Sequence, residues 1–275
     1  MVGQEKILET VKTLIDNNKF PKFMLLQGAR GWGKTQLVRE IAKLKGVDLV
    51  TFENKVDDLR ECIKLAYEQT SPIIYVLTGG DTMSVAAKNS ILKLIEEPPL
   101  NAYIIMLVEN EETVLPTIRS RAFMLKMDSY TQDDIRAYLV TKDNAFTQEE
   151  LDKIINICNC PGEANLLMQS ENAELLDLVD KLLDNIDKVT LSNLLKISKK
   201  FKINDASEGM DITLFLNCVQ FYLFNRYLKS KDKRCYKSYI EVVSTRKMLR
   251  ANTTNKLYTL DSLLTEMWKI WNYGN

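Results

Sequence analysis

The sequence predicts a mixed α/β domain built on a parallel sheet, followed by a helical region. Three observations support this fold class. A phosphate-binding loop pattern, Gly28 to Thr35, lies between a short apolar run and a segment with helical periodicity. Continuous apolar runs such as 73–77 are typical of strands that are buried on both faces of a parallel sheet. Strand signals alternate with helical signals up to about residue 127 and then stop.

The expected strands form a five-stranded parallel sheet with helices on both faces. They cover residues 23–27, 48–52, 73–77, 103–108 and 123–127. The expected helices of this core cover 5–17, 34–45, 59–68 and 84–95, each with apolar residues three or four positions apart. Gly46 ends the second of these helices, and Pro98-Pro99 follows the fourth.

The remainder of the chain is expected to be helical. Two Thr-x-x-acid capping boxes, beginning at Thr131 and Thr147, each open a helix, and a break follows at Pro161-Gly162. From about residue 172 onward we expect five helical segments, with breaks near Lys188, Asn204, Lys231 and Ala251. These signals predict three domains: a nucleotide-binding core over 1–127, a small helical domain over 128–171 and a larger helical domain over 172–275.

Composition narrows the classes of function. The 37 basic residues balance the 37 acidic ones, so any nucleic-acid surface must be local. No apolar run approaches the length that spans a bilayer, and the N-terminus lacks a signal-peptide pattern. The five scattered cysteines suit free thiols in a reducing compartment. A cytoplasmic location is therefore expected. The chain has no histidine, which excludes His-based triads, His general bases and His-ligated metals.

The loop pattern has a direct chemical interpretation. Gly28, Gly31 and Gly33 let successive backbone N–H groups turn toward an anion, and the following helix presents its positive dipole end to the same anion. Lys34 would reach the outer phosphates, and the Thr35 hydroxyl would bind Mg²⁺. The expected ligand is therefore ATP or ADP with Mg²⁺.

Four motifs in order resemble the AAA+ clamp-loader subunits of DNA replication. They are Val2-Gly3-Gln4, the loop at 28–35, the stretch 90–99 that ends in Glu-Glu-Pro-Pro, and Leu115 to Arg121 with its Ser-Arg pair. Segments 249–252 and 257–264 resemble the last helices of the bacterial delta-prime subunit of DNA polymerase III. This resemblance implies an AAA+ core, a helical lid and an oligomerising helical collar. It also implies gamma/tau-like and delta-like subunits as partners in a heteromeric ring, which reaches a sliding clamp and primer-template DNA, with no membrane partner.

The sequence departs from that family in its cysteines. Delta-prime and gamma subunits hold a four-cysteine zinc insert after the first helix of the core, whereas here Gly46 leads directly into the second strand. Cys62 stands alone nearby, and the Cys158-x-Cys160 pair has no second pair of ligands, so no zinc is expected.

The catalytic positions depart further. Active members end the third strand in Asp-Glu, which hold Mg²⁺ and orient the attacking water, but Thr78 and Gly79 stand there. We interpret the nearby Asp81 as a cap of the following helix; a compensating catalytic role for it remains an alternative. Val108 replaces the polar sensor at the end of the fourth strand, unless a one-residue shift brings Asn110 there. The lid has no sensor arginine after Pro161-Gly162 either.

Arg121 is the favoured functional arginine. The resemblance implies that this residue, after Ser120 and with Ala122 where the family has Cys, projects toward a neighbouring subunit's γ-phosphate. The alternative is a surface or ion-paired arginine. Arg119 occupies a variable position of the family pattern and is less favoured.

Two further features remain open. Lys229 to Arg250 is rich in basic residues, and a solvated helix face or subunit contact is favoured over a nucleic-acid surface. Trp32 would pack over the nucleotide or against the lid.

The first hypothesis is a delta-prime-like subunit that grips ATP, hydrolyses it poorly or not at all, and supplies Arg121 in trans within an ATPase complex. One alternative is an active motor ATPase of the same family, with Asp81 or Asn110 compensating. Another is an AAA+ interaction module outside replication.

Overall fold

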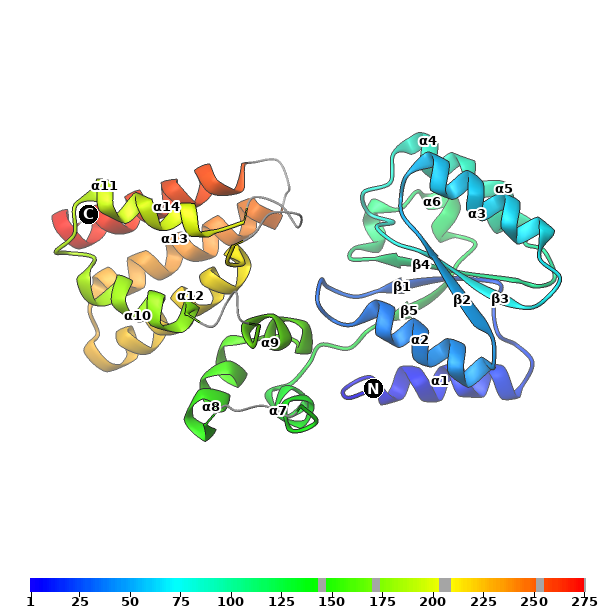
Figure 1. Cartoon of the computed structure of the whole chain (residues 1–275), viewed down its shortest axis with the longest axis horizontal. Helices are drawn as coiled ribbons and strands as arrows, with labels where there is room; N and C mark the ends of the chain where they lie inside the picture. The colour runs from blue at the N-terminus through cyan, green and yellow to red at the C-terminus, as the bar shows by residue number, and fades with distance from the viewer. Residues whose placement is uncertain (143–146, 170–173, 203–208, 251–254, 275) are drawn as a thin grey trace. The chain divides into compact units, whose positions relative to one another are not determined.

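The computed structural model describes residues 1–142, 147–169, 174–202, 209–250 and 255–274. Its first part is a five-stranded sheet flanked by helices (Figure 1). The elements are α1 (Glu5–Asp16), β1 (Phe23–Gln27), α2 (Lys34–Lys45), β2 (Asp48–Phe52), α3 (Val56–Glu68), β3 (Ile73–Leu77), α4 (Val85–Ser90), α5 (Leu92–Glu96), β4 (Ala102–Val108), the 3-10 turn η1 (Glu111–Thr113), α6 (Pro116–Arg119) and β5 (Phe123–Lys126).

The strands are parallel and lie in the order β2-β3-β4-β1-β5. Side chains of β1 alternate between two cores, as expected for a strand that is covered on both faces. Phe23 and Leu25 pack into the cluster under α3 to α6, whereas Met24 and Leu26 pack into the cluster under α1 and α2. The predicted α/β core with helices on both faces of a parallel sheet is thus confirmed.

The predicted helix 84–95 is divided in two. Ser84 caps α4 by accepting a hydrogen bond from the Ala87 N–H at 3.1 Å, and Ile91 separates α4 from α5. The Ser90 hydroxyl donates to the Ala87 carbonyl at 2.7 Å. Such a local side-chain bond competes with the helical ladder, which explains why the periodic pattern did not produce one continuous helix.

The rest of the described chain is mainly helical. It contains α7 (Gln132–Val140), α8 (Gln148–Ile157), α9 (Pro161–Leu167), α10 (Leu175–Asn185), α11 (Leu191–Leu195), the 3-10 segment η3 (Lys196–Lys200), α12 (Ile212–Ser230), α13 (Lys233–Arg250) and α14 (Lys256–Tyr273). Both capping boxes are confirmed, with Thr131 exchanging hydrogen bonds with Asp134 and Thr147 with Glu150. The breaks near Lys188 and Lys231 are also confirmed, whereas those near Asn204 and Ala251 lie outside the described residues.

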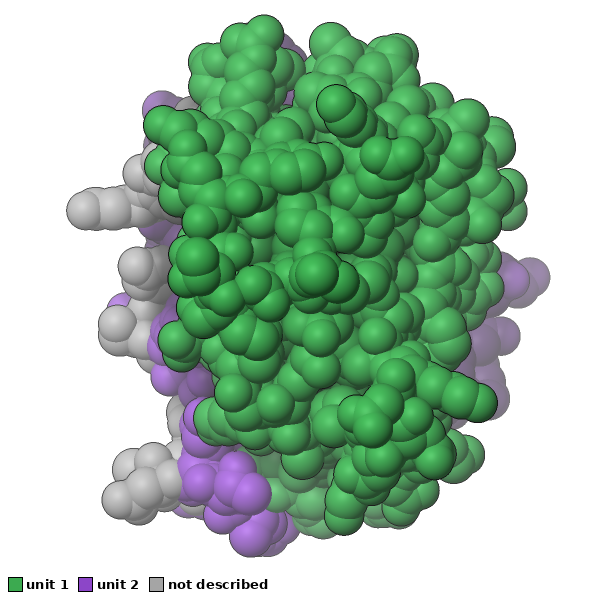
Figure 2. Space-filling model, turned by 90° about the vertical axis from the view of Figure 1, so that its right-hand side faces the viewer, with its two compact units in different colours: residues 1–138, 160–162 green, residues 139–159, 163–275 purple. Residues whose placement is uncertain are grey.

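The chain divides into two compact units, which Figure 2 distinguishes by colour. Unit 1 comprises residues 1–138 together with 160–162, and unit 2 comprises 139–159 and 163–275. Among the described helices, none is long and apolar enough to cross a membrane.

The cysteine thiols provide a test of this packing. All five lie among the described residues, none forms a disulfide, and all are buried. Burial raises the pKa of the Cys62 thiol to about 12. Burial likewise raises the pKa of Cys218 and Cys235. Because the thiolate is the reactive form, we expect less than one thiol per chain to react rapidly with a disulfide reagent at pH 8, and all five after unfolding in guanidinium. Rapid reaction of one or more thiols in the native chain would contradict the described core.

Candidate nucleotide-binding site

The sheet order places the phosphate-binding loop at the end of its central strand. β1 lies between β4 and β5, and the register pairs Gln27 with Val108 on one side and with Lys126 on the other. The Gly28 N–H then donates to the Val108 carbonyl at 3.1 Å, which extends the β1–β4 ladder by one bond into the loop. The loop and the ends of β3 and β4 therefore share the carboxyl edge of the sheet, where open α/β sheets bind ligands.

The loop glycines are required by the backbone. Gly31 and Gly33 have φ angles of 81° and 84°, in the left-handed region that favours glycine. A Cβ on Gly28 would lie 2.9 Å from the Met127 sulfur, so a larger residue there would require the Met127 side chain to shift. Helix α2 starts directly after Gly33, which puts the first N–H groups of the helix at the loop.

Three successive loop carbonyls accept hydrogen bonds from elsewhere in unit 1. The donors are Cys160 Sγ to Arg30 at 3.9 Å, the Gly162 N–H to Gly31 at 3.1 Å, and the Tyr130 hydroxyl to Trp32 at 2.8 Å. These bonds, made from segments about 100 to 130 residues away, hold the loop in place before any ligand binds. The loop conformation is therefore built by the fold as well as by its own glycines.

Trp32 packs against Tyr130 with the two rings edge to face, 6.0 Å apart and at 86°. It also packs on the cluster that α1 and α2 form with the sheet. Burial raises the pKa of Tyr130 to about 12, so its hydroxyl remains a donor across the neutral range. Tyr130 lies within the segment that was expected to form the lid, so this contact corresponds to the second of the two positions considered for Trp32.

Lys34 lies at the mouth of the loop, where its ammonium group donates to the carbonyls of Gly28 and Ala29. Burial lowers the pKa of Lys34, while the carboxylates of Glu109 and Asp81 act in the opposite direction. A phosphate oxygen is a stronger acceptor than a carbonyl for this ammonium group, because the hydrogen bond is then between two charges. Lys34 is thus placed to exchange loop carbonyls for phosphate.

The third-strand positions carry no carboxylate. The Thr78 hydroxyl donates to the Phe52 carbonyl at 3.1 Å and is engaged in the sheet. Gly79 has a φ of 64°, and a Cβ there would lie 3.0 Å from the Asn54 amide nitrogen. A glutamate at this position would meet both backbone strain and the Asn54 side chain.

Asp81 has a structural role that differs from the expected one. The interpretation of Asp81 as the cap of the next helix is wrong, because Ser84 occupies that position. Both Asp81 oxygens accept hydrogen bonds from the turn after β4: from the Glu109 N–H at 2.6 Å, the Asn110 N–H at 2.8 Å and the Thr113 hydroxyl at 2.9 Å. Asp81 therefore ties the end of β3 to the end of β4 and is already engaged by three donors.

The sensor positions are also accounted for. Val108 is fully buried as the last residue of β4. The Asn110 side chain accepts a hydrogen bond from the Glu112 N–H at 3.0 Å and caps η1. Asn110 thus uses its side-chain oxygen in the turn.

Arg121 lies at the surface of unit 1, just after α6, with 40% of its side chain exposed. Its guanidinium group pairs with the Glu96 carboxylate at 2.9 Å and donates to the Thr117 carbonyl at 2.7 Å. Glu96 is the first acid of the Glu-Glu-Pro-Pro motif, to which the sequence assigned no separate role. The ion-paired arrangement considered as the alternative is the one observed in the single chain.

Three basic residues of the stretch 229–250 make contacts within unit 2. Arg234 forms an ion pair with Asp232 at 2.8 Å, and its guanidinium group lies over the Trp271 ring at 4.7 Å. Lys237 donates to the Gly274 carbonyl at 3.3 Å, and Arg246 donates to the Gln220 side chain. These contacts favour a structural helix face over a nucleic-acid surface. Within the described ranges, no group of three or more Cys, Asp or Glu is arranged to hold a metal ion; the absence of zinc stays a prediction.

Known proteins that are similar to this chain include subunits of DNA polymerase III. A family model described as DNA polymerase III, delta subunit, matches residues 49–131. DNA polymerase III subunit gamma of Buchnera aphidicola is 27% identical over 58% of this chain and 53% of its own length. Subunit tau of Bacillus subtilis is 28% identical over 44% of this chain and 27% of its own length. The chain thus spans about half of the first relative and about a quarter of the second.

Two solved structures share the fold. The RuvB Holliday junction branch migration motor of Thermotoga maritima aligns with a TM-score of 0.51 and 17% identity, covering 82% of this chain and 76% of that one. A DNA polymerase III gamma-subunit-related protein of Thermotoga maritima aligns with a TM-score of 0.50 and 19% identity, covering 95% and 98%.

The fold and the phosphate-binding loop define an AAA+ P-loop protein. Within that class, the matches support a clamp-loader AAA+ subunit, since the chain is similar in sequence to DNA polymerase III subunits.

The contact between Gly162 and the loop can be tested directly. A Cβ on Gly162 would lie 2.3 Å from the Gly31 carbonyl oxygen, so Gly162→Ala must move the start of α9 away from the loop. We expect faster amide hydrogen exchange in a peptide covering residues 28–35. Glu61→Ala, at an exposed position of α3, is the control and should leave that peptide unchanged. Unchanged exchange in both variants would show that Gly162 at the start of α9 does not hold the loop.

Proposed function

We propose that this chain is a delta-prime-like clamp-loader subunit that binds ATP or ADP with Mg²⁺, hydrolyses it poorly or not at all, and supplies Arg121 to a neighbouring subunit. The observation that carries the proposal is a contrast at one edge of the sheet. The residues of the phosphate-binding loop are all present, and contacts within unit 1 hold the loop in place. By contrast, the two positions that hold the catalytic Asp-Glu pair in active members hold Thr78 and Gly79.

The grip is supported by the geometry of the loop. The loop backbone is shaped by Gly28, Gly31 and Gly33. The Lys34 ammonium group lies beside this backbone, where it donates to the Ala29 carbonyl. Thr35, half-buried in the first turn of α2, would offer its hydroxyl to Mg²⁺. When bound, Mg²⁺ would neutralise charge on the phosphates, and the loop N–H groups would position them.

Impaired hydrolysis is supported by the hydrogen bonds that already occupy Asp81 and Asn110, the two residues that could replace the missing catalytic groups. Phosphoryl transfer depends on positioning and charge neutralisation, so losing the Mg²⁺-binding and water-orienting carboxylates costs several orders of magnitude in rate. Asp81, the nearest acid in sequence, is engaged by three donors of the β4 turn. Asn110 likewise caps η1. These contacts count against the active motor alternative.

The role in trans is supported by the surface position of Arg121. Its pair with Glu96 is partly exposed, with 40% and 45% of the two side chains accessible, and such pairs contribute only about 0–1 kcal/mol. The guanidinium group can therefore leave Glu96 for a phosphate at little cost. The partners would be gamma/tau-like and delta-like subunits in a heteromeric ring, which would reach the sliding clamp and primer-template DNA through the complex.

Nucleotide binding should depend on Lys34. A hydrogen bond to a charged group contributes about 1.5–3 kcal/mol. Lys34→Ala should therefore weaken the Kd for Mg-ATP by about tenfold to a hundredfold, measured with a fluorescent ATP analogue. Lys43→Ala in the last turn of α2 is the control, since its side chain is 72% exposed, and should leave the Kd unchanged. An equal Kd for wild type and Lys34→Ala would refute the grip.

Hydrolysis in a mixture with a gamma-type subunit of the same organism should depend on Arg121. An arginine supplied in trans contributes about 10³–10⁵ in rate, so Arg121→Ala should remove most of the ATPase activity that this chain stimulates. Arg119→Ala, exposed two residues earlier, should have little effect.

Glu96→Gln completes this series. It removes the ion pair but leaves Arg121 in place, so stimulation should remain within a few-fold of wild type. If Arg121→Ala stimulates as well as wild type while Arg119→Ala does not, the finger is misassigned.

A further inference from the structure

The side-chain amide of Asn217 is a polar group in unit 2 that the fold itself does not explain. Asn217 lies in α12, and only 3% of its surface is exposed. Neither its amide nitrogen nor its amide oxygen has a hydrogen-bond partner among the described residues. Because an unpaired buried polar group is costly, a donor and an acceptor left together indicate a site for a partner of complementary chemistry.

Asn217 lines a pocket of about 210 Å³, which we call the α12 pocket. One wall is a single face of α12, because Asn217, Phe221 and Phe224 follow one another at steps of four and three residues. Tyr239 and Arg246 of α13 and the end of α8 form the other walls. All the lining residues belong to unit 2.

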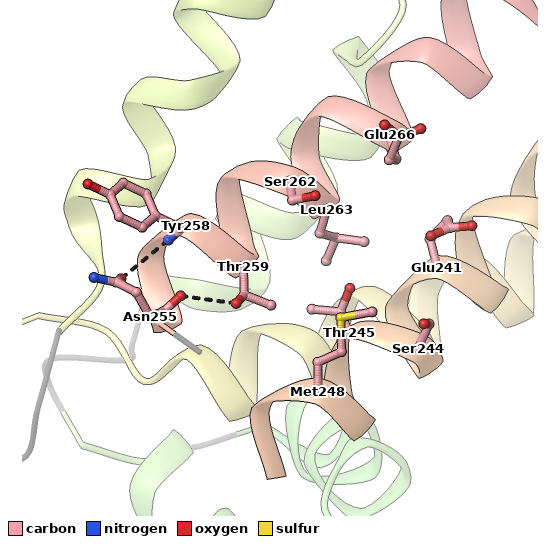
Figure 3. A pocket seen from close by; sticks show the side chains of 10 residues that line it. All are labelled: Glu241, Ser244, Thr245, Met248, Asn255, Tyr258, Thr259, Ser262, Leu263 and Glu266. Carbon is pink, nitrogen blue, oxygen red and sulfur yellow. Dashed lines mark hydrogen bonds between the residues drawn. The ribbon is translucent and has the colours of Figure 1, made fainter. Parts of the chain in front are cut away.

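A second pocket of unit 2, shown in Figure 3, provides a contrast. There the Asn255 side-chain oxygen accepts hydrogen bonds from the N–H groups of Leu257 and Tyr258 at 3.0 and 3.4 Å. The Thr259 hydroxyl donates to the Asn255 carbonyl at 3.0 Å. These groups serve the start of α14, whereas the amide of Asn217 serves no such purpose in α12.

The two asparagines at the end of α8 also differ from Asn217. The Asn156 amide donates to the Asp152 carbonyl at 2.7 Å. The Asn159 amide donates to the Glu163 carboxylate at 3.2 Å. Asn217 is therefore distinct among the asparagines of the α12 pocket, since neither atom of its amide is bonded within the described chain.

The charge of the α12 pocket is positive. Arg246 is the charged side chain among the described residues that line it, and no carboxylate is in that set. Its guanidinium group donates to the Gln220 oxygen, and the Gln220 amide donates to the Tyr239 hydroxyl at 3.4 Å. The nearby Glu163 carboxylate is bonded to Asn159. The pocket therefore favours a neutral or anionic ligand over a cation.

Aromatic rings restrict the ligand further. Phe221, Phe224 and Tyr239 line the α12 pocket, and the Phe224 side chain is 47% exposed. The rings of Phe224 and Tyr239 lie 5.9 Å apart at 41°, so they present flat faces beside the amide. A water molecule needs only about 30 Å³, so the pocket has room for a planar ring that would stack on these side chains.

We propose that the α12 pocket binds a nucleobase, which carries a hydrogen-bond donor and acceptor side by side on one edge. Asn217 would pair with that edge through both amide atoms, as asparagine pairs with adenine. The amide can turn toward the pocket without losing a hydrogen bond, because it makes none within the described chain. Phe224 and Tyr239 would stack on the base, and Arg246 would attract a phosphate attached to it. This inference does not depend on the nucleotide-binding role of unit 1.

Isothermal titration calorimetry of the full chain with two nucleosides tests the proposal. Adenosine has its 6-amino donor beside the N1 acceptor, whereas purine riboside lacks the amino group. Neither carries a phosphate for the loop of unit 1. We expect adenosine to bind at least about tenfold more tightly than purine riboside. Asn217→Leu should reduce adenosine to the affinity of purine riboside, and Phe224→Ala should weaken both by about fivefold or more.

The matched control is Asn185→Leu, at an exposed position of α10 outside the pocket, which should bind like wild type. Asn217→Leu replaces an unpartnered amide by an apolar side chain of similar size, so it should not lower the melting temperature measured by circular dichroism. Phe224→Ala changes an exposed ring and provides an independent variant if the first one is unstable.

A third ligand, a single-stranded oligodeoxyadenylate of about six nucleotides, distinguishes two sources of the base. Binding tighter than that of adenosine, and lost in Asn217→Leu, would support an unpaired base of DNA; weaker binding would support a free nucleoside or nucleotide. Three results would overturn the proposal. They are equal binding of adenosine and purine riboside, adenosine binding that Asn217→Leu does not change, and no adenosine binding at all, in which case water alone pairs with Asn217.

Discussion

The parallel pairing of β1 with β4 and β5 is the constraint on which the rest of the site depends. This pairing places the Gly28 N–H where it donates a hydrogen bond to the Val108 carbonyl. That bond attaches the phosphate-binding loop to the end of the neighbouring strand β4. The same order brings the turn after β3 to this edge and leads the chain from β5 to Tyr130, which holds Trp32. A change in strand order would separate these groups, whatever their identity.

Grip and cleavage make different physical demands on this edge. Nucleotide binding requires oriented N–H groups and one flexible cation, and in the proposed function the glycine loop and Lys34 would supply them. Cleavage needs free carboxylates, and the nearest one, on Asp81, is used to close the β4 turn. Gly79, with its positive φ and the Asn54 amide beside it, leaves little room for a new acid. The contacts of a few residues thus distinguish the requirements for nucleotide binding from those for hydrolysis.

Much of the fold was predictable, because continuous apolar runs and helical periodicity report burial directly. The loop was predictable from its glycines, and the capping boxes from their four-residue pattern. The bonds from Tyr130 and Gly162 to the loop were not, since they join segments about 100 residues or more apart and neither residue belongs to a local motif that specifies such a contact. The roles of Asp81 and Glu96 were missed for a related reason: sequence shows an acid, whereas its partner is chosen by the tertiary fold.

The central claim is that this chain retains nucleotide without cleaving it. The most direct measurement is a single-turnover experiment with the isolated chain in excess over labelled Mg-ATP. We predict that the nucleotide is recovered as ATP, with cleavage at least about a hundredfold slower than the ~1 s⁻¹ of an ordinary enzyme. Cleavage by the chain alone near that ordinary rate, abolished by Lys34→Ala, would contradict the account.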